Sequence, residues 1–248
     1  MYLKIGNINI YYQKLGKGKP LIMLHGWGND VSSFWNISQV LKENFTIYLL
    51  DLPGFGKSDI PKNFNVEDFA EVIKNFIKLQ GLNKPNILGH SLGGRIAIKL
   101  TSKYPNLIER LILEDSAGVG PKKTLINLSL QTMAKLFNLI PDFFQFKSKL
   151  KIKFYKKISS DYLKTGENKE TFKNIISEDL TLVLSKIKNE TLLIWGEIDE
   201  TEEASLAHGK KMYQLIPNSR LEVLEDTGHF PHLEKPNQFI NLVQDFLL

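Results

Sequence analysis

A single serine stands among glycines in Gly89-His90-Ser91-Leu92-Gly93, directly after an apolar run and directly before a helical pattern. A Gly-x-Ser-x-Gly pentapeptide at a strand-to-helix turn holds the serine on a sharp bend and exposes its hydroxyl. Glycines two residues before and after the serine let the strand and the helix pass closely. We therefore predict that Ser91 is a nucleophile and that the backbone N–H of Leu92 binds an oxyanion.

A serine hydroxyl attacks a carbonyl efficiently only when a base removes its proton. His229 follows Gly228, just past the last expected strand, and this places it at the sheet edge where the serine turn also lies. His232, three residues later, is the alternative, while His208 falls within an expected helix. We predict that His229 is the base.

The base needs a carboxylate that fixes its tautomer and stabilises the imidazolium. Asp199 follows the expected strand 191–195 in Trp195-Gly-Glu-Ile-Asp199. The chain order serine, acid, histidine is one of the known orders of such a triad. We predict Asp199 as the acid. Asp115, at the end of the preceding expected strand, is its rival.

A second oxyanion donor is expected from the loop His25-Gly26-Trp27-Gly28, whose glycines let the backbone approach a substrate. We predict the N–H of Trp27 for this role. The residues that flank these groups are expected to contact the substrate, namely His25, Gly26, His90 and Phe230. The chain has no cysteine, which excludes thiolate metal sites, and the predicted chemistry needs no metal and no organic cofactor.

Short apolar runs alternate with helical patterns along the chain, which predicts a mainly parallel sheet with helices packed against it. The first two strands are short and joined by a turn at Asn7, so they are expected to pair antiparallel. The expected strands are 2–5, 8–13, 20–25, 45–50, 86–88, 110–113, 191–195 and 219–224, and the expected helices are 33–42, 66–80, 92–104, 203–215 and 236 onward.

Residues 117–187 lack a strong strand pattern and interrupt this alternation. We predict a core of residues 1–116 and 188–248 with a helical cap inserted at 117–187, where it can cover a site. Six lysines interleaved with aromatic residues lie between Asp142 and Asp161. They are typical of a solvated amphipathic face. An alternative hypothesis is a docking surface for an acidic carrier protein or an anionic membrane surface.

The 248 residues have a formal net charge of +5, mostly from lysine, and this favours no nucleic-acid partner. No run reaches the roughly 18 apolar residues of a membrane span, so stable membrane insertion is not expected. The N-terminus lacks the pattern of a signal peptide. Together with the absence of cysteine, these features lead us to expect a cytoplasmic protein.

Taken together, these motifs resemble the α/β-hydrolase superfamily, in particular serine esterases and lipases with a helical cap. The resemblance implies an α/β-hydrolase fold with an eight-stranded, mostly parallel sheet. It also implies hydrolysis of small carboxylic esters with an apolar acyl part through an acyl-enzyme. The loops near His25 and Asp51 are similar to those of pimeloyl-carrier-protein methyl ester esterases. The matching pieces are His25-Gly-Trp-Gly28, Asp51-Leu-Pro-Gly-Phe-Gly-Lys-Ser58, Gly89-His-Ser-Leu-Gly-Gly94, Trp195-Gly-Glu-Ile-Asp199 and Gly228-His229.

Other activities of the same superfamily stay open. The site could also serve a C–C bond hydrolase, a perhydrolase or an acyltransferase, and the fold can also serve a non-catalytic binding protein. Epoxide hydrolases and haloalkane dehalogenases of this superfamily have aspartate at the position of Ser91. Its C–C bond hydrolases typically have asparagine before the serine and tryptophan after the histidine, where this chain has His90 and Phe230.

Overall fold

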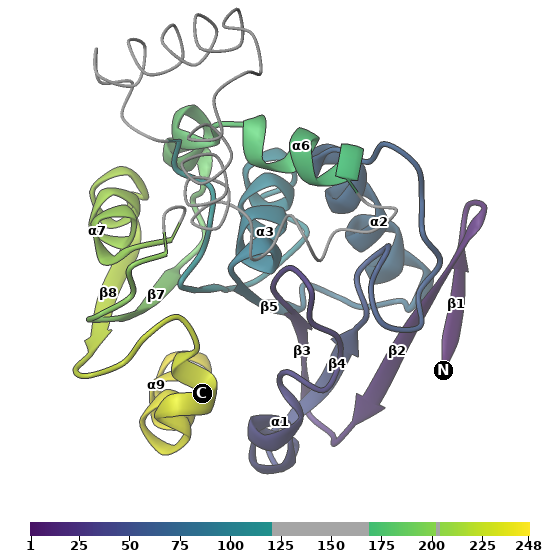
Figure 1. Cartoon of the computed structure of the whole chain (residues 1–248). Helices are drawn as coiled ribbons and strands as arrows, with labels where there is room; N and C mark the ends of the chain where they lie inside the picture. Colours follow the sequence, from purple (N-terminus) through teal and green to yellow (C-terminus); the bar gives the residue numbers. More distant parts are fainter. Residues whose placement is uncertain (121–168, 202–203) are drawn as a thin grey trace, which may run out of the picture.

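The computed structural model describes residues 1–120, 169–201 and 204–248, and within them eight strands form one sheet (Figure 1). The strand order is β1-β2-β4-β3-β5-β6-β7-β8. Strands β1, β2 and β4 pair antiparallel, and all other neighbours are parallel. The predicted eight-stranded, mostly parallel sheet is thereby confirmed. The strands are β1 (Tyr2–Ile5), β2 (Ile8–Leu15), β3 (Lys19–Leu24), β4 (Phe45–Leu50), β5 (Asn86–His90), β6 (Leu111–Glu114), β7 (Thr191–Gly196) and β8 (Ser219–Leu224).

Helices cover both faces of the sheet (Figure 1). Helices α1 (Trp35–Leu41) and α9 (Pro236–Leu247) pack on one face, and α2 (Val66–Leu79), α3 (Leu92–Lys103) and α7 (Leu206–Leu215) pack on the other. Successive strand residues alternate between the two layers, as in β3, where Leu21 and Met23 face the α1 side and Ile22 and Leu24 face the α3 side. The all-apolar strand pattern follows from this two-sided burial.

Local signals fix the boundaries of α2. The Asn65 side chain accepts a hydrogen bond from the backbone N–H of Asp68, and the Asp68 carboxylate accepts one from the N–H of Asn65. This capping box satisfies two backbone donors that the first helical turn leaves without partners. The helix ends just before Gly81, whose φ of +62° lies in the left-handed region that favours glycine.

The structure differs from the sequence-based expectation at several boundaries. Helix α1 begins at Trp35 rather than 33, and α7 begins at Leu206 rather than 203. The four-residue helix α8 (Pro231–Glu234) was not predicted, because so short a helix has no measurable hydrophobic period. The boundaries of the cap remain a prediction. Its described part contains α6 (Lys169–Ser177) and the 3₁₀ helix η2 (Thr181–Lys186), and the six lysines lie outside the described residues.

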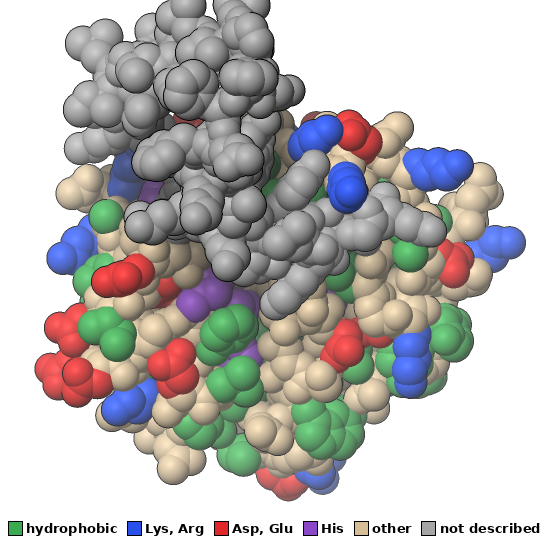
Figure 2. All heavy atoms as spheres, in the orientation of Figure 1, with side chains coloured by type: hydrophobic (Ala, Val, Ile, Leu, Met, Phe, Trp, Pro, Cys, Tyr) green, Lys and Arg blue, Asp and Glu red, His purple; other side chains and the backbone are tan. Residues whose placement is uncertain are grey.

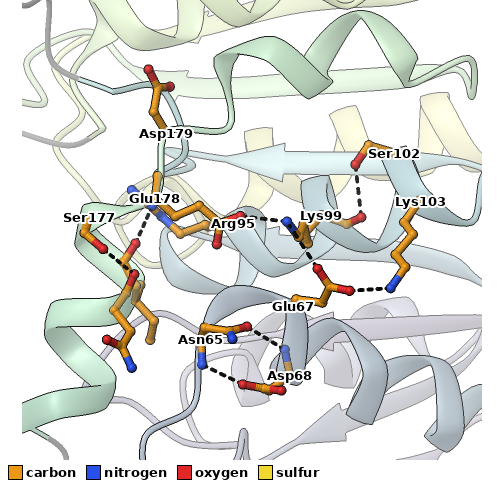
Figure 3. Close-up of polar contacts among 12 residues, drawn as sticks. Asn65, Glu67, Asp68, Arg95, Lys99, Ser102, Lys103, Ser177, Glu178 and Asp179 are labelled. Atoms are coloured by element: carbon orange, nitrogen blue, oxygen red, sulfur yellow. Dashed lines mark hydrogen bonds and ion pairs between the residues drawn. The ribbon is translucent and has the colours of Figure 1, made fainter.

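Helix α3, which begins directly after Ser91, binds the end of α6 (Figure 3). The buried guanidinium of Arg95 donates hydrogen bonds of 2.6 Å to the carbonyl oxygens of Ile175 and Glu178. One turn later, Lys99 Nζ lies 2.7 Å from the Glu178 carboxylate. A cation beside the last carbonyls of a helix is favourable. None of the described helices is long and apolar enough to cross a membrane.

Candidate active site

Ser91 sits on a strained turn between β5 and α3. Its backbone has φ 50° and ψ −109°, outside the helical and strand regions. The N–H of Ser91 donates to the carbonyl of Glu114 at 3.0 Å, and its own carbonyl accepts from Ala117 at 3.2 Å and from Arg95 at 3.1 Å. These contacts with the end of β6 and with α3 hold the turn, as the pentapeptide predicts for a nucleophile elbow.

Substitution of Gly93 by alanine tests the close approach that the elbow requires. A Cβ at Gly93 would lie 2.0 Å from the carbonyl oxygen of Leu24, which is β3 backbone and cannot move away cheaply. We expect Gly93→Ala to lower the free energy of unfolding by about 3 kcal/mol or more. Urea denaturation measures this loss.

Gly81→Ala is the matched control for that substitution. A Cβ there would meet nothing within 4 Å, but Gly81 has φ +62°, so only the left-handed backbone is penalised. The expected loss is about 1 kcal/mol. Equal losses in the two variants would contradict the steric explanation.

The predicted oxyanion loop lies directly against the nucleophile turn. A Cβ at Gly26 would lie 2.8 Å from His90 Nδ1 and 3.3 Å from Ser91 Cβ, so only glycine allows this approach. The Trp27 ring packs edge-on against Phe55 at 4.8 Å and against Phe172 of α6 at 4.8 Å. This aromatic cluster fixes the loop that contains the Trp27 N–H, although that N–H as an oxyanion donor remains a prediction.

His229 and Asp199 are in direct contact at the carboxyl ends of β8 and β7. His229 Nδ1 lies 2.9 Å from Asp199 Oδ2, and the side chain of His229 is 20 % exposed while that of Asp199 is 2 % exposed. Histidine side chains gather near the middle of the face drawn in Figure 2, beside hydrophobic ones. The sequence left Asp115 open as the acid, and the structure places Asp199 on His229.

The charge state of Asp199 suits an acid that orients a histidine. Burial alone would raise its pKa, but hydrogen bonds from His229 and Thr201 outweigh burial and bring the pKa of this carboxyl below its usual range. Asp199 is therefore a carboxylate at neutral pH and can stabilise an imidazolium at His229.

Asp115 is next to Asp199, but its carboxyl group is neutral whereas that of Asp199 is ionised. Burial and the negative charges of Glu114 and Asp199 raise the pKa of Asp115 to about 10. Its carboxyl oxygens lie 3.2 and 3.3 Å from the N–H of Gly196, and it shares a hydrogen bond with Asp199. At neutral pH Asp115 is thus a neutral carboxylic acid that supports the ionised Asp199.

The raised pKa of Asp115 predicts a pH-dependent stability. Between the ordinary pKa of 3.8 and the folded-state value of about 10, the folded protein holds a proton that the unfolded chain releases. Stability therefore falls as pH rises through this window, by at most about 1.4 kcal/mol per pH unit. Asp115→Asn lacks this titrating group. The free energy of unfolding of the variant, minus that of the unsubstituted chain, should therefore increase as pH rises.

Urea denaturation of both proteins at about pH 5, 7 and 9 measures this difference. Asp226→Asn is the control. Asp226 also has a positive φ, 49°, but its side chain is exposed, so the same substitution is made without burial. Parallel stability curves for Asp115→Asn and the unsubstituted chain would contradict the neutral carboxyl.

Two of the predicted substrate contacts are buried histidines, and their role toward a substrate stays a prediction. His25 and His90 are each 1 % exposed, and their rings bind protein backbone. His25 Nε2 accepts from the N–H of Leu52 at 3.0 Å, and its Nδ1 lies 2.8 Å from the Gly26 carbonyl. His90 Nε2 donates to the carbonyl of His229 at 2.8 Å. Burial, and then its histidine neighbours, hold the pKa of His90 well below its usual range, so the ring is neutral.

Sequence reasoning also missed several residues that support the site. Glu234 of α8 accepts hydrogen bonds from the N–H groups of Gly228 and Phe230 at 2.8 and 3.1 Å, one on each side of His229.

Asp51 accepts from the N–H groups of Val31 and Lys57 at 2.7 Å each, which joins the two loops next to the nucleophile. Phe230 and Gly26 stay predicted substrate contacts.

Asp115, Asp199 and His229 are the one described group with three side chains close enough to share a metal ion, with their ligand atoms within 4.8 Å of one another. Two of these atoms, His229 Nδ1 and Asp199 Oδ2, already bind each other, and Asp115 is protonated. A metal would have to displace both the proton and this hydrogen bond. We therefore interpret the cluster as a proton-transfer arrangement.

Known proteins resemble this chain in sequence and in fold. A family profile described as "alpha/beta hydrolase fold" matches residues 19–182. A 2-hydroxy-6-oxo-6-phenylhexa-2,4-dienoate hydrolase of Comamonas testosteroni is 28% identical, and the alignment covers 96% of this chain and 91% of that one. A pimeloyl-[acyl-carrier protein] methyl ester esterase of Wigglesworthia glossinidia brevipalpis is 26% identical, with 96% and 97% covered.

Among solved structures, a bacterial membrane phospholipase A described as a virulence factor superposes with a TM-score of 0.78. It is 25% identical, and the alignment covers 100% of this chain and 84% of that one. The chain is therefore similar both to proteins named as an esterase or a phospholipase and to a protein named as a dienoate hydrolase.

Proposed function

The chain belongs to the alpha/beta hydrolase fold family, and we propose that it is a serine hydrolase that cleaves carboxylic esters with an apolar acyl part. The observation that supports this most directly is the 2.9 Å contact between His229 Nδ1 and Asp199 Oδ2, at the sheet edge where the strained Ser91 turn also lies. Nucleophile, base and orienting acid are the three groups that acyl transfer requires.

In the first half-reaction, Ser91 Oγ attacks the ester carbonyl while His229 Nε2 takes the hydroxyl proton. Asp199 stabilises the resulting imidazolium through its hydrogen bond with Nδ1. The N–H groups of Trp27 and Leu92 bind the oxyanion of the tetrahedral intermediate; Leu92 opens α3, where first-turn N–H groups have no partner within the helix. The C–O bond breaks, and His229 returns its proton to the departing alcohol.

In the second half-reaction, water attacks the acyl-enzyme. His229 removes a proton from the water, the same oxyanion donors act again, and the proton then passes to Ser91 Oγ as the acid departs. All proton transfers use one histidine, and no electron transfer occurs. A different entering nucleophile, a peroxide or an acceptor alcohol, would make the same intermediate serve perhydrolysis or acyl transfer.

Cleavage of a C–C bond is the second candidate, because relatives at 28% identity have that activity in their names. The position before the nucleophile argues for ester cleavage. His90 is buried and donates its Nε2 proton to the carbonyl of His229, so it supports the protein rather than a substrate. An ester needs only one proton at its leaving oxygen, which His229 supplies.

The test compares the two substrate classes on one protein. A series of p-nitrophenyl esters with acyl chains of rising length is assayed by release of nitrophenol. The dienoate of the Comamonas enzyme is assayed by loss of the absorbance of its conjugated system. We expect ester turnover with a chain-length optimum and much slower loss of the dienoate.

The opposite ratio would replace the ester proposal with C–C cleavage. Tight binding without turnover of either class, unchanged in Ser91→Ala, would identify a binding protein. The lysine-rich segment of the cap, with its hypothetical acidic carrier or anionic surface, is tested separately with a carrier-linked ester.

A further inference from the structure

A second histidine–carboxylate pair lies beside the first and is fully buried. Glu114, the last residue of β6, and His232 of α8 are both 0 % exposed. Glu114 Oε1 accepts a hydrogen bond of 2.8 Å from the backbone N–H of His232 and lies 2.6 Å from His232 Nδ1. On the far side of the ring, His232 Nε2 lies 3.1 Å from Ser33 Oγ.

The contacts of Glu114 arrange this pair like the pair at the active site. Glu114 Oε1 accepts the backbone N–H of His232 and lies next to His232 Nδ1, as Asp199 Oδ2 lies next to His229 Nδ1. The arrangement hydroxyl, imidazole, carboxylate therefore repeats the order of the triad, with Ser33 in place of the nucleophile. Its imidazole has no exposed surface, so it cannot serve a substrate directly.

The pair joins three segments that build the active site. Glu114 precedes Asp115 and accepts the Ser91 N–H on its backbone carbonyl. His232 belongs to the same short stretch as His229. Ser33 follows the oxyanion loop and lies just ahead of α1. One buried contact thus connects the nucleophile turn, the base and the oxyanion loop.

The neighbourhood of the pair shows what it supports. The ring of His232 lies 5.3 Å from that of His90, and the ring of His90 lies 4.8 Å from that of His229. His90 also binds the carbonyl of His229, while Glu234 binds the N–H groups on both sides of it. Three polar groups of the backbone at residues 228–230 are therefore bound, and Glu114 binds the backbone N–H of His232 in the same stretch.

We propose that Glu114 and His232 are positioning residues that hold His229 in register with Ser91, a proposal that rests on the proposed role of His229 as base. Buried ion pairs contribute little net stability, because desolvation offsets their attraction. A gain in stability alone is therefore a weak reason for this pair. Its effect is on geometry, since a shift of about 1 Å in a catalytic group costs up to about 100-fold in rate.

The test uses a fluorophosphonate probe, which labels a serine only when its base is correctly placed and which needs no knowledge of the substrate. We expect His232→Ala to slow labelling of Ser91 by about 10- to 100-fold. His232→Asn keeps an N–H near the position of Nδ1 and should recover most of the rate. Glu114→Gln keeps the acceptor oxygen but loses the charge, and an intermediate rate is expected.

Two further measurements separate positioning from folding. Glu109→Gln is the matched control, because Glu109 lies just before β6 but is exposed and forms an ion pair with the exposed Lys19. It should label at the unsubstituted rate.

Proton NMR should show two imidazole N–H signals downfield of the amides, from the His229–Asp199 and His232–Glu114 contacts. His232→Asn should remove one signal and keep the other.

Two results would overturn the proposal. One is a folded His232→Ala protein, by thermal unfolding and circular dichroism, that labels at the unsubstituted rate. The other is labelling that tracks thermal stability across all variants without recovery in His232→Asn. Failure of the proposed function looks different: the unsubstituted protein would label rapidly and yet turn over no ester, and the positioning role would still be measured by labelling. An unsubstituted protein that does not label would overturn both.

Discussion

Ser91→Ala is expected to lower kcat for the best p-nitrophenyl ester by about 10⁴- to 10⁶-fold. The variant keeps the oxyanion donors and the His229–Asp199 pair but lacks the atom that forms the acyl-enzyme. The residual rate should resemble hydrolysis by water in a binding site that still stabilises an oxyanion. Steady-state kinetics give the loss, and mass spectrometry of the fluorophosphonate adduct locates the labelled residue.

Ser102→Ala is the matched control for that substitution. Ser102 lies on the same helix α3, and its Oγ donates to the carbonyl of Lys99 at 3.0 Å (Figure 3), so an identical change is made far from the elbow. It should leave kcat unchanged. An adduct on another serine, or equal losses in the two variants, would remove Ser91 from the mechanism.

Asp199→Asn is expected to lower kcat by about 10⁴-fold with little change in KM. The Asp199 carboxylate accepts from His229 Nδ1, which leaves Nε2 free to take the serine proton. An asparagine amide in its place can donate to Nδ1, so it favours the tautomer with hydrogen on Nε2, which is not a base. The loss therefore appears in the chemical step rather than in binding.

Asp115→Asn distinguishes the two carboxyl groups. Because Asp115 is protonated at neutral pH, an amide of the same shape replaces a neutral group by a neutral group. We expect a loss of less than about tenfold, as for a group that acts through Asp199. A larger loss in Asp115→Asn than in Asp199→Asn would assign the role of triad acid to Asp115.

The parts of the site that sequence could predict are those encoded locally. The Gly89–Gly93 turn, the loop at 25–28 and the residues after each strand follow from short motifs and from apolar runs. Because parallel strands bring their carboxyl ends to one edge of a sheet, the sequence alone predicts that Ser91 and His229 lie at the same edge. The same rule could not choose between Asp115 and Asp199, since both follow neighbouring strands.

The parts that sequence could not predict depend on long-range pairing and ring orientation. Glu114 and His232 are 118 residues apart, and no local pattern links them. A signal did exist: Glu114 and Asp115 are consecutive acids at the end of an all-buried strand, where unpaired charge is costly. Residue type also gives no ring direction, so the contacts of the His25 and His90 rings with backbone groups could not be predicted.

Three residues other than glycine with positive φ, Ser91, Asp115 and Asp226, lie just after β5, β6 and β8 at the edge that holds the site. Each such conformation costs about 1–3 kcal/mol, which the buried clusters on both sheet faces must offset. Selection for heat tolerance alone would therefore favour relaxation of this edge, for example by glycine at these positions. Thermal stability and catalytic activity therefore favour different backbone conformations just after β5, β6 and β8. Laboratory evolution of this chain should be screened for both properties together.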